Sequence, residues 1–490
     1  MVRVHEPLDK LAVPVRYRIS PDARRRRPPP GRENPSPRPK PNTPDGAGKN
    51  SFRNTSKTRV PVLDYRHFLT DAPGSRSDRD TWRLVACALA FIVASEYEFR
   101  IRSQDQSISG NPDFFVLLEI ATYGVVACWL FLRFRPAPRL TTAHWTTLAA
   151  YGYIATLFLS TVYSPYFEMA LVRSCQMAII LALTRSTARH SNRASMHCFA
   201  HAYSALITAS VIFGVLVPFP RRESQPDRFT WLYLHPVAAG QLLAIAVIVL
   251  ASYIIGRRNT RIGPRWPLGV YLGMLAVCAG GLVATNTRGA ALAAAVGSVT
   301  ALWLRWRGTR RLEITAFLSV GALAVGLAAA PAIAGFFTRG HSMSRLMTLN
   351  ARTELWGYAL EAFAQRPLYG HGQSATRGLF LDEMGLGGGH NAVINLLVNS
   401  GLLGLVAWSA LVIGVFVNSA RAKRLTPEPR VDRTIIISVS LGMLANSVFT
   451  EALGAPANAA AVWLLMLAAW AGMLRDEADG ASRTVSTAAR

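Results

Sequence analysis

Long apolar segments separated by short polar ones fill the chain from residue 81 to residue 474. Most are about 20 residues long, the length an α-helix needs to cross the hydrocarbon core of a membrane. The pattern predicts an all-α polytopic membrane protein with about 12 transmembrane helices. These are expected at residues 81–97, 112–133, 144–163, 168–185, 196–217, 234–256, 266–284, 289–304, 312–331, 391–419, 434–450 and 457–474.

Basic residues gather in every second connection between these segments. The dense groups lie at 133–139, 185–193, 257–265, 305–311 and 421–433. Cytoplasmic loops of membrane proteins carry an excess of Lys and Arg, so both termini are predicted to be cytoplasmic. The intervening connections are poor in charge, as at 164–167 and 451–456, and are expected outside together with a large loop over 332–390.

The composition of the two ends of the chain differs from that of the apolar middle. Residues 1–80 contain 13 of the 28 prolines and 18 of the 53 Lys and Arg residues, with no apolar segment that could form a signal peptide. They predict a disordered basic cytoplasmic tail that can meet the lipid bilayer, and residues 475–490 predict a second cytoplasmic tail. Because basic inner loops account for the net charge of +25, no nucleic acid partner is expected, and a 51% hydrophobic chain excludes a soluble enzyme.

Metal-binding patterns are weak in this sequence. The five cysteines lie in apolar segments without the spacing of metal ligands. His197 and His201 are four residues apart on one helix face, so they form either a metal pair or two polar core histidines. Glu96, Glu98 and Asp105 in the first outer connection resemble the acidic residues of metal-dependent lipid-linked glycosyltransferases. The prediction is that the protein uses no metal and no cofactor.

The first candidate site is the short connection Thr285–Ala290 on the outer side. It places Arg288 at the membrane boundary. A charged residue there usually faces a cavity or a partner. Alternatively, Arg288 only extends its guanidinium group from the helix terminus to the membrane–water interface.

The second candidate site lies in the large outer loop. Residues 351–365 predict a short amphipathic helix on the membrane face, with Asn350 as its N-cap. Arg352 would lie in its first turn, where the helix dipole and the guanidinium together favour an anion. The alternative is a surface arginine over the ring of Trp356.

The third candidate site is Gly387–Gly389 followed by His390 and Asn391, at the start of the tenth apolar segment. Three glycines predict a hinge. Histidine exchanges a proton near neutral pH, so His390 is a candidate catalytic base, although a histidine at a helix start can also be a cap.

Five further residues are predicted to bind substrate, and one of them has a structural alternative. Arg173 lies inside the fourth apolar segment, where its charge would either line a polar cavity or pair with Glu168. The five are Arg173, His235, Arg366, His371 and Asn391.

The order of these motifs resembles a known family. Thr-Arg-Gly-Ala (287–290) is followed by Arg-x-x-Leu-Trp (352–356), Pro-Leu-x-Gly-x-Gly (367–372), His-Asn (390–391) and Leu-Leu-x-x-x-Gly-Leu-Leu-Gly (396–404). Over residues 275–415 the chain resembles the O-antigen ligase and O-antigen polymerase superfamily of bacterial membrane glycosyltransferases.

The resemblance implies a GT-C-like fold and an inverting, metal-independent reaction outside the inner membrane. The donor would be a glycan on undecaprenyl pyrophosphate, and the acceptor a glycan or glycolipid. The catalytic residues of the family would fall on Arg288, Arg352 and His390. The arginines suit the charge of a pyrophosphate leaving group, and His390 would act as general base or hydrogen-bond the pyrophosphate.

Three alternatives stay open at this stage. A polysaccharide polymerase shares the same motifs and differs only in its acceptor. A transporter of a small anion would also have many helices and basic inner loops, although broken helices would then be expected at mid-membrane in both halves. The third alternative is a non-catalytic scaffold.

Overall fold

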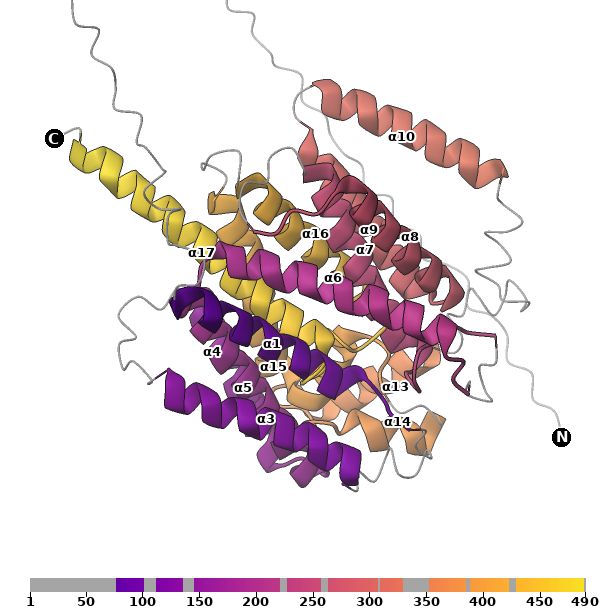
Figure 1. Cartoon of the computed structure of the whole chain (residues 1–490). Helices are drawn as coiled ribbons and strands as arrows, with labels where there is room; N and C mark the ends of the chain where they lie inside the picture. Colours follow the sequence, from indigo (N-terminus) through magenta and orange to yellow (C-terminus); the bar gives the residue numbers. More distant parts are fainter. Residues whose placement is uncertain are drawn as a thin grey trace, which may run out of the picture. The chain divides into compact units, whose positions relative to one another are not determined.

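The computed structural model describes residues 76–100, 112–134, 145–220, 227–256, 263–306, 309–328, 352–384, 388–422 and 429–488. Within these ranges the regular elements are α-helices (Figure 1). They are α1 (Arg76–Glu96), α3 (Phe114–Arg133), α4 (Trp145–Val162), α5 (Phe167–His190), α6 (Arg193–Leu216), α7 (Pro236–Gly256), α8 (Leu268–Ala284), α9 (Arg288–Arg305), α10 (Thr309–Ala328), α13 (Arg352–Gln365), α14 (Thr376–Met384), α15 (Ala392–Arg421), α16 (Pro429–Ser447) and α17 (Ala459–Ala488).

The chain is a multi-pass helical membrane protein. Among the described residues, six helices are long and apolar enough to cross a membrane, namely α3, α5, α6, α7, α15 and the Ala459–Asp479 part of α17. Helix α8 is apolar but shorter. Each apolar segment of the sequence coincides with a helix, whereas the count of twelve spans stays a prediction.

Some predictions concern residues that the structure does not describe, and others differ from it. The tail as far as residue 75, the cap Asn350, Gly387 and Asp105 lie outside the described residues. Helix α17 does not end near residue 474 but continues to Ala488. The extension contains no proline, and Arg475 and Asp479 form an ion pair of 3.5 Å at the helical spacing of four residues. Helix α14 was not predicted.

Helix α7 forms the interior of the bundle. It is apolar on all sides, as expected for a helix that packs against protein all around. It contacts α8, α9 and α16. Helix α3 differs, because Phe131 and Leu132 near its end are 71% and 80% exposed. Such an apolar surface is what a lipid-facing helix presents.

Helix α15 is interrupted at Gly401, whose φ of +62° and ψ of −160° are not helical. The turn Pro367–Gly372 fits against this break and forms main-chain hydrogen bonds with both sides of it. The bonds are His371 N to Val398 O (2.7 Å), Gly372 N to Asn399 O (2.9 Å), Leu402 N to Pro367 O (2.9 Å) and Leu403 N to Leu368 O (3.1 Å). We call this arrangement the docked turn. It satisfies backbone groups that the interrupted helix leaves unpaired.

Replacing Gly401 by alanine is expected to lower stability by about 1–3 kcal/mol or more, since this backbone conformation is strained for any residue with a side chain. A Cβ would also lie 2.5 Å from the main chain of Leu368. Thermal unfolding in detergent tests this. Gly357→Ala on α13, where a Cβ meets nothing within 4 Å, is the control. Equal unfolding temperatures would contradict the prediction.

Candidate functional site

A cavity of about 380 Å³ opens among the ends of several helices. Its lining comes from the last turn of α1, the first turns of α5, α7, α14 and α15, and the connection between α16 and α17. The charge pattern of the loops predicts that these ends face outside the membrane. His390, Arg173 and His235 of the predicted site residues line it.

His390 is held at the cavity by its main chain. Its φ of +47° is left-handed, and its N–H donates to Glu451 Oε2 at 3.1 Å. The neighbouring Gly388 leaves room for the same carboxylate, since a Cβ there would lie 2.6 Å from it. Trp356 Nε1 of α13 donates to Gly389 O at 3.2 Å. The glycines therefore fit His390 between Glu451 and Trp356.

Three neighbours determine the proton affinity of His390. Burial lowers the pKa of its ring below the usual value of 6.5, and the positive charge of Arg352 lowers it further. The carboxylate of Glu451 acts in the opposite direction and raises it. The net direction is downward, so the ring is mostly neutral at pH 7, as a general base must be.

Arg352 lies close enough to both Arg288 and His390 for its charge to act on each of them. Burial lowers the pKa of the Arg352 guanidinium, the nearby charge of Arg288 lowers it further, and Glu451 raises it. Arg352 Cζ lies 5.9 Å from the ring centre of Phe449, so its aromatic contact is with Phe449 rather than Trp356. Two like charges at one place favour an anion between them.

Arg288 begins α9 directly after a sharp turn. Its Nε is buried and has no hydrogen-bond partner among the described residues. Arg228 Nη2 donates to Thr287 Oγ1 at 2.7 Å, and Arg228 Nε donates to Thr285 O at 2.8 Å. Arg228, which the sequence did not single out, thus fixes the turn that presents Arg288. Gly289 packs closely on Phe449.

Helix α13 carries Arg352 as its first residue. Its apolar residues Leu355 and Ala359 are fully buried and pack with Phe380 of α14 and Val398 of α15. Helices α13 and α14 lie next to each other (Figure 1). The apolar face of α13 therefore rests on protein, and this packing fixes the position of Arg352.

Arg173 lines the cavity and also forms an ion pair. Its Nη1 lies 3.0 Å from Glu119 Oε1 on α3, so its carboxylate partner is Glu119 rather than Glu168. Gln176 Nε2 donates to the same Glu119 oxygen at 2.9 Å. A second bond from Arg173 reaches Ala457 O at 3.2 Å. The arginine therefore connects α3 and α5 to the connection before α17.

His235 and Asn391 act as helix caps in the structure. His235 Nδ1 accepts from Val237 N at 3.2 Å at the start of α7, while its ring also lines the cavity. Asn391 Oδ1 accepts from Val393 N (2.9 Å) and Ile394 N (3.1 Å), and its Nδ2 donates to Val448 O. Asn391 is not among the residues that line the cavity.

Arg366 and His371 are not among the residues that line the cavity; Arg366 directly precedes the docked turn, and His371 is part of it. Arg366 is exposed. The ring of His371 is engaged through Nε2 with Ala362 O at 2.7 Å, and its N–H donates to Val398 O. The structure therefore does not bring these two residues to His390, and it shows structural contacts for His371.

His197 and His201 are buried near the opposite end of the bundle. His197 contacts Tyr253 OH (2.7 Å) and Asp432 Oδ1 (3.2 Å). His201 contacts His197 O and Tyr271 OH, both at 2.7 Å. The ring nitrogens are thus occupied by core partners. Within the described ranges, no group of three or more His, Cys, Asp or Glu side chains is placed to hold a metal ion.

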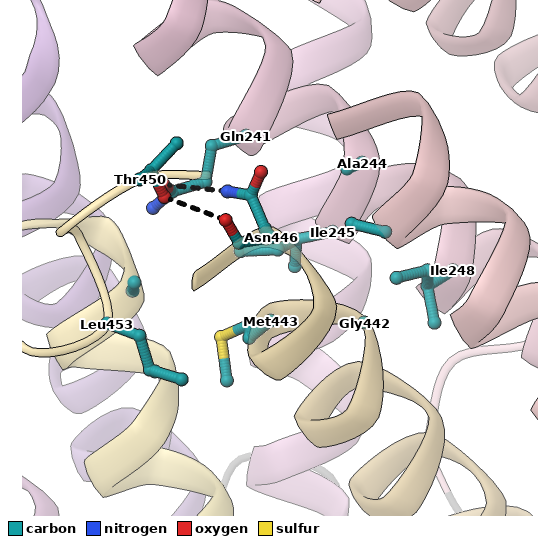
Figure 2. Close-up of a pocket in the computed structure, with 11 residues that line it drawn as sticks. Gln241, Ala244, Ile245, Ile248, Gly442, Met443, Asn446, Thr450 and Leu453 are labelled. Carbon is teal, nitrogen blue, oxygen red and sulfur yellow. Dashed lines mark hydrogen bonds between the residues drawn. The ribbon is translucent and has the colours of Figure 1, made fainter. Parts of the chain in front are cut away.

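A polar network lies behind the cavity wall (Figure 2). Asn446 Nδ2 donates to Gln241 Oε1 at 3.2 Å, and Thr450 Oγ1 donates to Asn446 O at 3.3 Å. Gln241 and Thr450 also line the larger cavity. The network joins α7 to the end of α16 and fixes the amide plane of Gln241 from behind.

Sequence reasoning missed the acidic partner of the site. Glu451 belongs to the connection 451–456, which was grouped with the charge-poor outer loops, yet its carboxylate contacts His390. One signal was available, because Glu451 is the only charged residue of that connection. Its link to His390 spans 61 residues, and no local spacing rule reveals such a pair.

Comparison with known proteins agrees with the motif order. The family model described as O-antigen ligase matches residues 272–409, a range that contains Arg288, Arg352 and His390. No curated protein matches the chain. Together with the six candidate membrane spans of the described residues, the match supports an O-antigen ligase or polymerase type of membrane protein. Over residues 272–409, this chain is similar to the O-antigen ligase family.

Proposed function

We propose that the protein is an inverting glycosyltransferase that moves a glycan from undecaprenyl pyrophosphate to an acceptor hydroxyl. The observation that supports this proposal is the position of Arg352, whose charge acts on both Arg288 and His390 although the three residues come from separate segments. We place the reaction on the outer face of the inner membrane, with both termini cytoplasmic, as the basic loops predict.

His390 acts as the general base in this proposal. It takes the proton of the acceptor hydroxyl, whose oxygen forms a bond to the anomeric carbon. The bond from that carbon to the pyrophosphate oxygen breaks, and undecaprenyl pyrophosphate leaves with both electrons. Arg288 and Arg352 hold the charge that develops on the leaving group. The lowered pKa of His390 supports the role of base over that of a protonated pyrophosphate ligand.

The site supports a reaction without a metal ion, since two guanidinium groups stabilise the pyrophosphate charge directly. Arg352 adds the N-terminus of α13, where a helix dipole favours an anion. The unpartnered buried Nε of Arg288 is a further donor for phosphate oxygen.

Reconstitution of the full chain in liposomes tests the proposal. The assay would supply undecaprenyl-pyrophosphate glycan in EDTA, with candidate glycan and glycolipid acceptors and with donor alone. We expect release of undecaprenyl pyrophosphate by the native protein. Growth of the donor glycan on its own lipid indicates a polymerase, and transfer only to an added acceptor indicates a ligase. Solute uptake without any transfer would contradict the proposal and favour a transporter.

A further inference from the structure

Four buried amide side chains line the cavity beside His390, and one of them has an unused acceptor. Asn395 is 6% exposed, and its Oδ1 has no hydrogen-bond partner among the described residues. A buried polar atom without a partner in the empty protein is unfavourable. It therefore points to a ligand that supplies the missing hydrogen bond. The four amides are Gln241, Gln373, Asn395 and Asn399.

The amides are rigidly placed. Asn395 and Asn399 are four residues apart on α15 and so share one helix face. Asn399 Oδ1 accepts from Thr376 N at 3.0 Å, which orients its NH₂ group. Gln241 is fixed by Asn446 from behind (Figure 2). Each amide carries both donors and acceptors, as does a hydroxyl group, so the set matches a ligand rich in hydroxyls.

The charges of the lining favour a neutral ligand. Two arginines, Arg173 and Arg377, are matched by two glutamates, Glu96 and Glu451. Arg173 also forms an ion pair with Glu119, which offsets its positive charge. Neither Arg288 nor Arg352 lines the cavity, so the cations suited to a pyrophosphate lie elsewhere. A volume of about 380 Å³ falls in the range of small-molecule sites, about 300–1,000 Å³.

We propose that this cavity is the subsite for a neutral sugar of the acceptor, with Asn395 as a hydrogen-bond acceptor for one of its hydroxyls. This inference rests on the proposed transfer reaction in one respect, which is that the sugar in the cavity belongs to the acceptor rather than to the donor. His390 lines the cavity, so a hydroxyl that loses its proton to His390 comes from this side. The leaving pyrophosphate is bound by Arg288 and Arg352.

Asn395→Leu tests the subsite in the reconstituted transfer assay. The variant removes the unpartnered oxygen at nearly equal size, so the empty protein should unfold at the same or a higher temperature. We expect KM for the acceptor to rise about tenfold or more, with KM for the donor and the pH profile unchanged. A purely structural role for Asn395 would instead lower the unfolding temperature. A rise in KM for the donor alone would overturn the acceptor assignment.

Two controls accompany this variant. Asn418→Leu replaces a buried asparagine near the other end of α15 whose Nδ2 donates to Thr146 Oγ1 at 2.9 Å, so it is expected to lower the unfolding temperature and to leave KM for the acceptor unchanged. Asn395→Asp keeps the size and an acceptor oxygen, so we expect it to retain a lower KM for the acceptor than Asn395→Leu. An unchanged KM for the acceptor in Asn395→Leu would overturn the inference.

Direct binding separates this inference from the transfer reaction. Saturation-transfer NMR on the full chain in lipid nanodiscs would use methyl α-glucopyranoside, methyl α-galactopyranoside and methyl α-mannopyranoside as probes. We expect at least one to bind the native protein and to lose its signal with Asn395→Leu. If a probe binds in this way but the reconstituted protein transfers no glycan, the sugar subsite is supported and the proposed function is contradicted. No binding by the native protein, or equal binding by the variant, would overturn the subsite.

Discussion

Replacing His390 by alanine is expected to slow glycan transfer by about 10²–10⁴-fold, the range that general acid–base catalysis contributes. The protein should still insert and fold, because the main chain at 389–390 is held by bonds to Glu451 and Trp356 rather than by the His390 ring. His190→Ala, at the exposed last turn of α5, is the matched control. Full activity of the His390 variant would remove it from the mechanism.

The pH profile shows which form of His390 is active. A general base works unprotonated, so the rate should fall as the pH drops through its pKa. Because burial and Arg352 lower this pKa, the fall should occur below pH 6.5. Glu451 raises the pKa, so Glu451→Gln should move the fall to still lower pH. A rate that instead falls as the pH rises would indicate a protonated His390 bound to pyrophosphate.

The second large effect is expected from the two arginines. Arg352→Ala and Arg288→Ala should each lower kcat by about 10²–10³-fold or more, since each removes a donor aimed at developing negative charge. Lysine keeps the charge but loses the planar pair of donors, so Arg352→Lys should recover only part of the activity. Arg421→Ala, at an exposed helix end, is the control and should keep normal kcat.

The double variant carries further information about this pair. If Arg288 and Arg352 hold the same anion, the loss in the double variant should be smaller than the product of the single losses. Independent effects that simply multiply would indicate that the two arginines bind different groups. The measurement is kcat in the reconstituted assay, on protein quantities matched by membrane insertion.

The helices were largely predictable from the sequence, because an apolar segment of about 20 residues is a strong local signal. Helix α14 was missed, since its nine residues have no clear apolar period. The interruption of α15 was missed for another reason. Gly401 lies within a segment of membrane length, and only the approach of residues 367–372 shows that the helix opens there.

The candidate site was predictable where a residue type was unusual for its surroundings. Arg288, Arg352 and His390 are polar groups beside membrane-length segments, and in the structure the charge of Arg352 acts on the other two, while their catalytic roles stay a prediction. Arg366 adjoins the Pro-Leu-x-Gly-x-Gly motif and His371 belongs to it; neither lines the cavity, so their role in binding substrate stays a prediction. Glu451 was missed because its contact with His390 depends on pairing between distant segments.

The docked turn also determines which parts of the protein are free to change. All four hydrogen bonds of the docked turn are made by main-chain atoms, so they do not depend on which side chains the bonded residues carry. Leu368 and Tyr369 at its tip are 60% and 47% exposed. The side chains at 368 and 369 can therefore change without breaking the four main-chain bonds, whereas Gly370 and Gly372 cannot, because a Cβ at either would lie within 2.6 Å of neighbouring main chain.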